Sequence, residues 1–200
     1  MFLPLLTGLG LSASAGMNAY LPLIIIAMVD RIRDGDLLSG GYEFISSIPV
    51  IIVLLVLVTI ELVADKSPAY RANDILQSII RPAAGALAFM ASASNTDFNL
   101  VAALLIGLVV AGVIHATKAA FRLRFPPKLR AVFVPAFSVA EDLYAAVLST
   151  LALVVPIVVP VLLIPAAGIA IWTVSRRPDH GPAVTVQDPN APNGSTVPQP

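Results

Sequence analysis

The sequence predicts an all-α integral membrane protein with about six transmembrane helices, some of them kinked or broken. Hydrophobic residues make up 58% of the 200-residue chain and charged residues only 12%. The mean hydropathy of +0.89 lies well above the range of soluble domains. The charges also gather in short clusters between uncharged runs. The longest run, residues 143–175, exceeds the roughly 20 apolar residues that cross a hydrocarbon core once.

The composition excludes several other classes of protein. Lys and Arg balance Asp and Glu at 12 each, so the chain has no basic field of the kind that binds nucleic acid. The absence of cysteine excludes disulfides, thiol catalysis and cysteine-based metal sites. With only two histidines, far apart in the sequence, we expect no metal ion and no cofactor.

The first apolar segment looks in part like a secretory signal, because an apolar stretch is followed by the small residues of 12–15. No Lys or Arg precedes that stretch, however, and the apolar run resumes after it. We therefore expect one retained crossing over about residues 5–28. Its small residues, within 8–16, favour close helix packing. The alternative is a broken helix whose freed backbone groups line a site, with Asn18 as a polar contact.

Five further crossings are expected, over about residues 48–64, 75–94, 99–117, 138–156 and 158–175. With both termini in the cytoplasm, every Lys and Arg except Arg31 and Arg33 falls on the cytoplasmic side, as the positive-inside rule requires. We therefore expect a multi-pass protein of the inner (plasma) membrane with both termini cytoplasmic. The transmembrane domain covers residues 1–177. The polar composition of residues 178–200 predicts a disordered cytoplasmic tail.

The expected crossings divide into two sets of three, in residues 1–94 and 99–175. Because each set is odd-numbered, the second set would enter the membrane in reversed orientation, which is the arrangement of inverted-repeat transporters. The sequence similarity between the halves is thin, as in Ala15–Ala19 against Ala111–His115, and chance explains it equally well. The inverted repeat is therefore one of two open interpretations.

Ionisable residues near the ends of the expected helices are the candidates for binding. Glu61 and Asp65 are four residues apart and share a helix face. Glu61 lies about one turn deeper, where an ionisable group is expensive unless it is paired or wetted. A binding role and simple helix pairing fit Glu61 equally well. Asp65 and Lys66 also fit ordinary interfacial residues.

The third and fourth expected helices add basic candidates. Pro82 is expected to kink or break its helix near Arg81, which could hold an anion there or extend toward the membrane surface. His115 and Lys118 fall on one helical stripe with Arg122. We expect His115 to pair with an acid from a neighbouring helix and Arg122 to anchor the helix end.

Two capping boxes are expected at helix starts. Asp74 with Gln77, and Ser138 with Glu141, have the required spacing. Capping explains Glu141 fully and the adjacent Asp142 only in part. We expect acids and bases from four helices to meet toward the cytoplasmic side as a paired polar cluster, namely Glu61, Asp65, Lys66, Arg81, His115, Lys118, Glu141 and Asp142.

Five motifs carry a resemblance to a known family. They are Gly10–Pro22 (GLSASAGMNAYLP), Glu61–Lys66 (ELVADK), Arg81–Gly85 (RPAAG), His115–Lys118 (HATK) and Ser138–Asp142 (SVAED). Together, over about residues 8–160, the chain resembles the bacterial membrane-protein family catalogued as domain of unknown function 4126. The resemblance implies a small polytopic inner-membrane protein, and it supplies no substrate or catalytic residue.

Three functions fit these features. The leading one is a small carrier, a secondary transporter or lipid-headgroup translocase. In it Lys66, Arg81 and Lys118 hold a small anionic solute or headgroup, and Glu61 or His115 takes a coupling proton. The alternative is a structural or assembly protein in which the same charges only pair helices. A membrane enzyme is least supported, because no nucleophile–base set is recognisable, so we expect no enzymatic activity. The bilayer is the expected partner, nucleic acid is not, and a homo-oligomer is left open.

Overall fold

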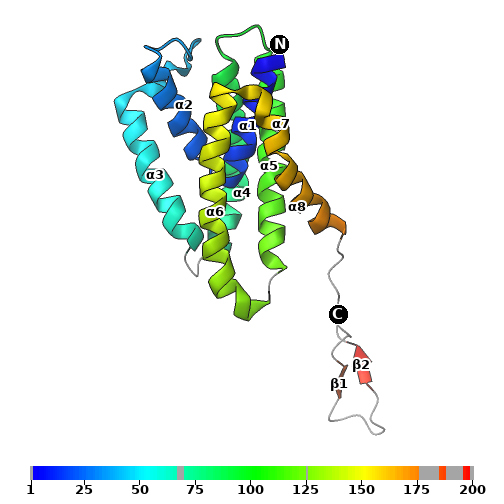
Figure 1. Ribbon diagram of the computed structural model, residues 1–200. Coiled ribbons are helices and arrows are strands. Elements are labelled where there is room, and N and C mark those ends of the chain that lie inside the picture. The colour runs from blue at the N-terminus through cyan, green and yellow to red at the C-terminus, as the bar shows by residue number, and fades with distance from the viewer. Residues whose placement is uncertain (1, 67–69, 125, 176–184, 188–195, 199–200) are drawn as a thin grey trace.

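The computed structural model describes residues 2–66, 70–124, 126–175, 185–187 and 196–198. Its body is a bundle of α-helices (Figure 1). The long helices are α3 (Ile48–Lys66), α4 (Tyr70–Ala93), α5 (Leu100–Leu123) and α6 (Pro127–Val154). Two shorter helices precede them, α1 (Phe2–Met17) and α2 (Leu21–Ile32), and the 3₁₀ turn η1 (Tyr42–Ser46) leads into α3. The predicted all-α class is confirmed.

Five stretches of the described residues are long and apolar enough to cross a membrane. They are Ile48–Lys66, Ala72–Ala93, Leu100–Leu123, Phe133–Val154 and Pro156–Thr173. These stretches overlap the five crossings expected after the first. Their outward faces carry exposed apolar side chains such as Ile52, Ile79 and Val109, which suit contact with lipid. The fold is therefore that of a multi-pass membrane protein.

The first apolar segment is a helical hairpin, and the single crossing expected over residues 5–28 is wrong. Helix α1 ends at Met17, residues 18–20 are not helical, and α2 begins at Leu21. With 16 and 12 residues, α1 and α2 are about 24 and 18 Å long. Each is shorter than a hydrocarbon core roughly 30 Å thick.

Both outer ends of this hairpin lie beside the connection between α4 and α5. Near the start of α1, Leu5 packs in the same cluster as Phe98. Beyond α2, the hydroxyl of Ser39 donates to the carbonyl oxygen of Ser94 at 2.8 Å. The tip of the hairpin lies inside the bundle, between the long helices (Figure 1).

The hairpin changes the expected position of the N-terminus. Helix α1 begins at the end of the bundle where loops 33–47 and 94–99 lie, whereas a single crossing would start it at the other end. The positive-inside rule could not detect this, because residues 1–30 contain no Lys or Arg. The two halves are also built differently, since residues 1–94 begin with a hairpin and residues 99–175 with the continuous helix α5.

Helix α1 is the central helix and packs against α4, α5 and α6. Glycine makes this approach close. A Cβ at Gly16 would lie 2.6 Å from the carbonyl oxygen of Ala111 on α5, and one at Gly10 would lie 2.6 Å from the Cβ of Ala152 on α6. The hydroxyl of Ser14 donates to the carbonyl oxygen of Ala145 at 2.8 Å. The small residues therefore serve close packing, as expected, and the helix break is present as well.

Helices α4 and α6 begin earlier than expected, which corrects both capping assignments. Asp74 and Gln77 lie inside α4, and Ser138 and Glu141 lie inside α6. A cap needs the free N–H groups of a helix start, and these pairs follow residues that are already helical. Helix α4 also continues through Pro82, so the expected break near that proline is absent.

The last apolar segment is divided at its prolines. It consists of the 3₁₀ turn η2 (Pro156–Val158), α7 (Val159–Leu162) and α8 (Ile164–Ser175). Helix α8 packs mainly on α5 and leans away from the rest of the bundle toward its C-terminal end (Figure 1).

The tail expected to be disordered falls largely outside the described residues. Its described parts are β1 (Thr185–Gln187) and β2 (Thr196–Pro198), which pair antiparallel with Val186 opposite Val197. A two-stranded ribbon of this length is marginally stable by itself, so it adds little to the fold.

Candidate functional site

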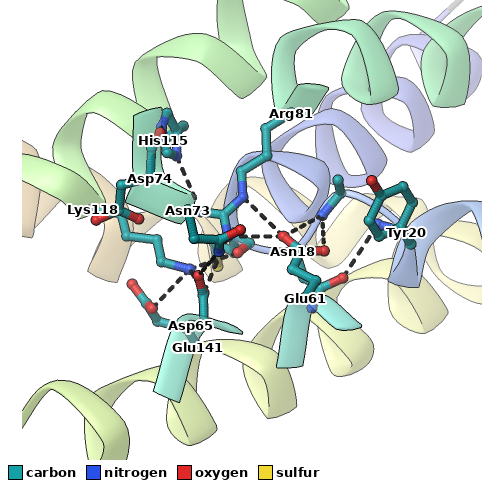
Figure 2. Close-up of polar contacts among 12 residues, drawn as sticks. Asn18, Tyr20, Glu61, Asp65, Asn73, Asp74, Arg81, His115, Lys118 and Glu141 are labelled. Carbon is teal, nitrogen blue, oxygen red and sulfur yellow. Dashed lines mark hydrogen bonds and ion pairs between the residues drawn. The ribbon is translucent and has the colours of Figure 1, made fainter. Parts of the chain in front are cut away.

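A set of ionisable side chains surrounds the tip of the hairpin (Figure 2). The set, called here the charge network, comprises Glu61 and Asp65 of α3, Asp74 and Arg81 of α4, His115, Lys118 and Arg122 of α5, and Glu141 of α6. Apart from the half-buried Asp74, each of these residues is at most 8% exposed. Charged groups at this depth are tolerated only when they are paired and hydrogen-bonded.

Glu61 and Arg81 form the pair nearest the break between α1 and α2. The Nη2 of Arg81 lies 2.8 Å from Oε1 of Glu61, and Nε donates to the same oxygen at 3.1 Å. The other carboxylate oxygen accepts the backbone N–H of Ala19 at 3.1 Å. Because the break leaves this N–H without a helical acceptor, Glu61 supplies the acceptor that the backbone needs.

Lys118 binds the other side of the same break. Its Nζ donates to the carbonyl oxygen of Met17 at 2.8 Å and to Oδ2 of Asp65 at 2.8 Å. It also lies 3.1 Å from Oε2 of Glu141. The ammonium group thus faces one carbonyl oxygen and two carboxylates. Lys118 therefore joins α1, α3, α5 and α6 at one point.

Asp65 is the centre of the charge network. Its Oδ2 accepts from Arg81 at 3.1 Å, from Lys118 at 2.8 Å and from Arg122 at 3.3 Å. Its Oδ1 accepts from Nδ2 of Asn73 at 2.6 Å. A carboxylate with this many donors belongs to the paired interior of the bundle and not to the membrane surface.

Arg122 is part of the network, so its expected role as an anchor at the helix end is wrong. Its Nη2 lies 2.8 Å from Oε2 of Glu141, and its Nη1 lies 3.2 Å from Oδ1 of Asp74. The sequence stripe through His115 and Lys118 thus continues onto Arg122, and all three lie on the buried face of α5.

His115 faces a base and not the acid expected for it. Its Nδ1 lies 3.1 Å from Nη1 of Arg81, and its Nε2 lies 3.0 Å from the carbonyl oxygen of Asp74. A guanidinium group can only donate and a carbonyl can only accept. The pattern therefore requires a neutral ring with its proton on Nε2.

A less buried branch lies beside the network and involves Lys66, Asp142 and Asn18. Lys66 Nζ is 2.7 Å from Oδ2 of Asp142, and Asn18 Nδ2 donates to Oδ1 of Asp142 at 3.1 Å. The side-chain oxygen of Asn18 accepts the backbone N–H groups of Tyr20 and Leu21, at 3.2 and 3.1 Å. Asn18 thus accepts two backbone N–H groups at the turn that leads into α2.

Among the side chains that the structure describes, the network and its branch carry one more negative than positive charge when every carboxylate is ionised. The carboxylates are Glu61, Asp65, Asp74, Glu141 and Asp142, and the bases are Lys66, Arg81, Lys118 and Arg122. Five acids against four bases leave a net charge of −1 when His115 is neutral. This balance favours one added proton or cation. Among the described residues, no group of three or more His, Cys, Asp or Glu is arranged to hold a metal ion.

A pocket of about 220 Å³ adjoins the network between α5, α6 and α8. Lys118 and Glu141 line it from the network side, and most of its other lining residues are apolar, among them Ile114, Phe137 and Ile169. The charged interior of the bundle is therefore in contact with an apolar space at membrane depth.

All nine candidate residues named from the sequence lie in the network or its branch, and sequence reasoning left out Asp74 and Arg122. The spacing of polar residues along the two helices could have identified both residues. Asp74, Gln77 and Arg81 on α4 have the same i, i+3, i+7 spacing as the stripe that ends in Arg122 on α5. Two such stripes on neighbouring helices are expected to face each other.

Comparison with known proteins identifies a family. The model of the family described as "Domain of unknown function (DUF4126)" matches residues 5–176, which include every residue of the charge network and its branch. Comparison with curated proteins gives no match, and comparison with solved structures gives none either.

Proposed function

The chain belongs to the DUF4126 family, and we propose that it is a small carrier of the inner (plasma) membrane, a secondary transporter or lipid-headgroup translocase. The basic end of the bundle, with the C-terminus, is cytoplasmic in this proposal. The observation that carries it is the attachment of the charge network to a helix break: Glu61 binds the N–H of Ala19, and Lys118 binds the carbonyl of Met17. No catalytic step is part of the proposal.

Helix packing alone does not account for so many buried charges. Close contact between α1 and its neighbours is already made by glycine and alanine, which is sufficient for association in lipid. Buried ion pairs add little net stability, and well-packed apolar residues often replace them without loss. Charges retained inside a membrane bundle are therefore better explained by binding than by stability.

In secondary transporters the binding site is typically formed where helices are interrupted inside the membrane and backbone groups are left free. A proton on Glu61 would remove the negative charge that holds Arg81 and would weaken the acceptor for Ala19. It would also bring the charge of the network and its branch to zero. A proton on Nδ1 of His115 would instead meet the guanidinium of Arg81, so Glu61 is the better site for a coupling proton.

The three bases expected to hold an anion are all engaged. The ion pairs join Lys66 to Asp142, Arg81 to Glu61 and Asp65, and Lys118 to Asp65 and Glu141. A small anionic solute or an anionic headgroup would therefore have to displace a carboxylate. The net negative charge supports instead a substrate or co-substrate that brings positive charge.

A structural or assembly role is the second candidate, and one observation favours it. The same ion pairs connect α3, α4, α5 and α6 around the hairpin tip, so they could serve only to hold the bundle together. The two candidates differ in what happens when a single charge is removed without changing the shape of the side chain.

The test is deletion of the gene, followed by comparison of surface lipid-carrier pools and solute sensitivities with the parent strain. If the protein is a carrier, one pool or sensitivity should change in the deletion strain. The wild-type protein should reverse this change, and a charge-network variant of normal abundance should not. A matched control is Glu43→Gln, which makes the same chemical change at an exposed acid in η1. A deletion strain with general envelope defects, equally restored by every folded variant, would favour the structural role.

A further inference from the structure

We propose that the pocket between α5, α6 and α8 binds an apolar alkylammonium compound, and that this is the substrate class of the carrier. That the pocket binds such a compound is argued from the pocket itself. That the compound is the substrate of the carrier rests on the proposed function.

The position of the pocket suits a molecule that arrives from the bilayer. Helix α8 packs on α5 but leans away from α6, and the pocket occupies the space between them. Its walls carry Ile114 from α5, Phe137 from α6 and Ile169 from α8. Residues of α8 on either side, such as Ile164 and Ile171, are exposed and apolar. An apolar chain that approaches α8 from lipid would therefore meet apolar side chains.

The charged end of the pocket presents a carboxylate, that of Glu141. Both ion pairs of Glu141, with Lys118 at 3.1 Å and with Arg122 at 2.8 Å, use Oε2. Among the described residues, neither ion pair of Glu141 uses Oε1. Lys118 donates to Met17 and Asp65 and forms an ion pair with Glu141, so an anion would have to compete with these partners.

Aromatic residues add to the preference for a cation. Phe137 and Tyr144 both line the pocket, and ring faces attract ammonium groups within about 6 Å. The hydroxyl oxygen of Tyr144 is buried and has no hydrogen-bond partner among the described residues. An amine or ammonium group near Glu141 would place its positive charge between the Glu141 carboxylate, this hydroxyl and the rings.

The charge balance selects among ligands of equal shape. The network and its branch carry a net charge of −1, so a cation compensates it and an anion increases it. A neutral alcohol with the same chain gains only the burial of its apolar part. Decyltrimethylammonium, decanol and decanoate therefore form a matched set of probes with one chain length and three charges.

Binding can be followed through Trp172, the only tryptophan in the chain. It lies on α8, three residues after the pocket residue Ile169, and packs against Phe121. With the full-length protein in nanodiscs of zwitterionic lipid, we expect decyltrimethylammonium to change the Trp172 fluorescence saturably. Decanol and decanoate should change the fluorescence only by partitioning into the lipid, and this change should not saturate. Saturable binding of decanoate with equal or higher affinity would overturn the proposal.

Filling the pocket provides the second arm of the test. Ala140→Phe on α6 and Ala166→Phe on α8 place a ring in the pocket from opposite walls, so one variant remains if the other does not fold. Each should weaken decyltrimethylammonium binding about ten-fold or more. The control is Val139→Phe, which adds a ring to the exposed face of the same helix and should leave binding unchanged. Equal binding by wild type and a folded pocket variant would overturn the assignment.

Proteoliposomes with an internal pH dye separate this proposal from the proposed function. If decyltrimethylammonium binds saturably in nanodiscs but its addition moves no protons, the assignment of the pocket stands and the carrier proposal is contradicted. If the cation is taken up with protons and the two pocket variants do not reduce this uptake, the carrier proposal stands and the assignment of the pocket is contradicted.

Discussion

Lys118 on α5 donates a hydrogen bond to the carbonyl oxygen of Met17 at 2.8 Å, and the same Nζ lies 2.8 Å from Oδ2 of Asp65. One side chain thus holds the end of the central helix α1 against α3 and α5. The contact compensates a backbone carbonyl that the helix break leaves free, and it places a positive charge where the hairpin turns. Any movement of the hairpin tip must loosen this contact.

Replacing Lys118 is expected to destabilise the protein strongly. Lys118→Met keeps the length of the side chain but leaves the Met17 carbonyl and part of the charge of Asp65 uncompensated, at a cost of about 3–5 kcal/mol. Lys66→Met is the control, because the pair that Lys66 forms is partly exposed, with 29% of its side chain accessible, and such pairs contribute about 0–1 kcal/mol. Thermal unfolding in detergent measures both. Equal melting temperatures for the two variants would contradict the central position of Lys118.

The close packing of α4 on α5 predicts a glycine effect. Gly85→Ala would place a Cβ 2.3 Å from the Ala111 Cβ and 2.9 Å from the Gly107 carbonyl oxygen, which should cost about 1–3 kcal/mol through overpacking. Gly168→Ala on α8 meets nothing within 4 Å and is the matched control. We expect it to leave thermal stability unchanged or slightly higher, because alanine favours a helix. A tolerated Gly85→Ala would mean that the helices are farther apart than described.

The site was more predictable from the sequence than the path of the chain. Glu61, Arg81 and His115 could be singled out because an ionisable side chain inside an apolar run is expensive, and that signal is local. The capping interpretation of Asp74 failed because a capping box and an interior polar stripe share the same spacing. Only the position of the helix start distinguishes them, and helix starts are poorly marked in apolar sequence.

The hairpin could not be predicted from hydropathy. Residues 1–29 are uncharged and mostly apolar, so a hydropathy window over them gives the same value whether the chain crosses or returns. The local signals of a turn were Asn18 and Pro22, which suit a new helix start, but glycine-rich packing explained the neighbouring residues equally well. The direction of α2 depends on contacts that are distant in sequence, such as that between Ser39 and Ser94.

The hairpin predicts that the N-terminus lies on the side of the membrane opposite the C-terminus. Topology reporters fused at the N-terminus, after Gly40 and at Asp97 should report one side, and a reporter at the C-terminus should report the other. The reason is that both outer ends of the hairpin lie beside the α4–α5 connection. An N-terminal reporter on the same side as the C-terminal one would restore the single crossing over residues 5–28.

The polar tail is expected to be dispensable for folding. Residues 178–200 are rich in Pro, Asn, Gly, Ser and Thr and have too little apolar surface to contribute to the bundle. Truncation after residue 177 should leave membrane abundance and thermal stability unchanged, as measured by quantitative blotting and melting in detergent. A large loss of folded protein would show that the tail contributes to the transmembrane domain.

Glu61→Gln tests the central claim most directly, by comparing thermal stability with rescue of the deletion strain at equal membrane abundance. Glutamine keeps one oxygen, which can take the place of Oε1: that atom accepts from Arg81 and lies 3.3 Å from the Ala19 nitrogen. The change also brings the charge of the network and its branch to zero, so the variant should fold. The account predicts a stable protein that does not restore the deletion phenotype, beside a Glu43→Gln control that restores it fully. A Glu61→Gln protein that is stable and fully active would contradict the proposal that this carboxylate takes part in transport.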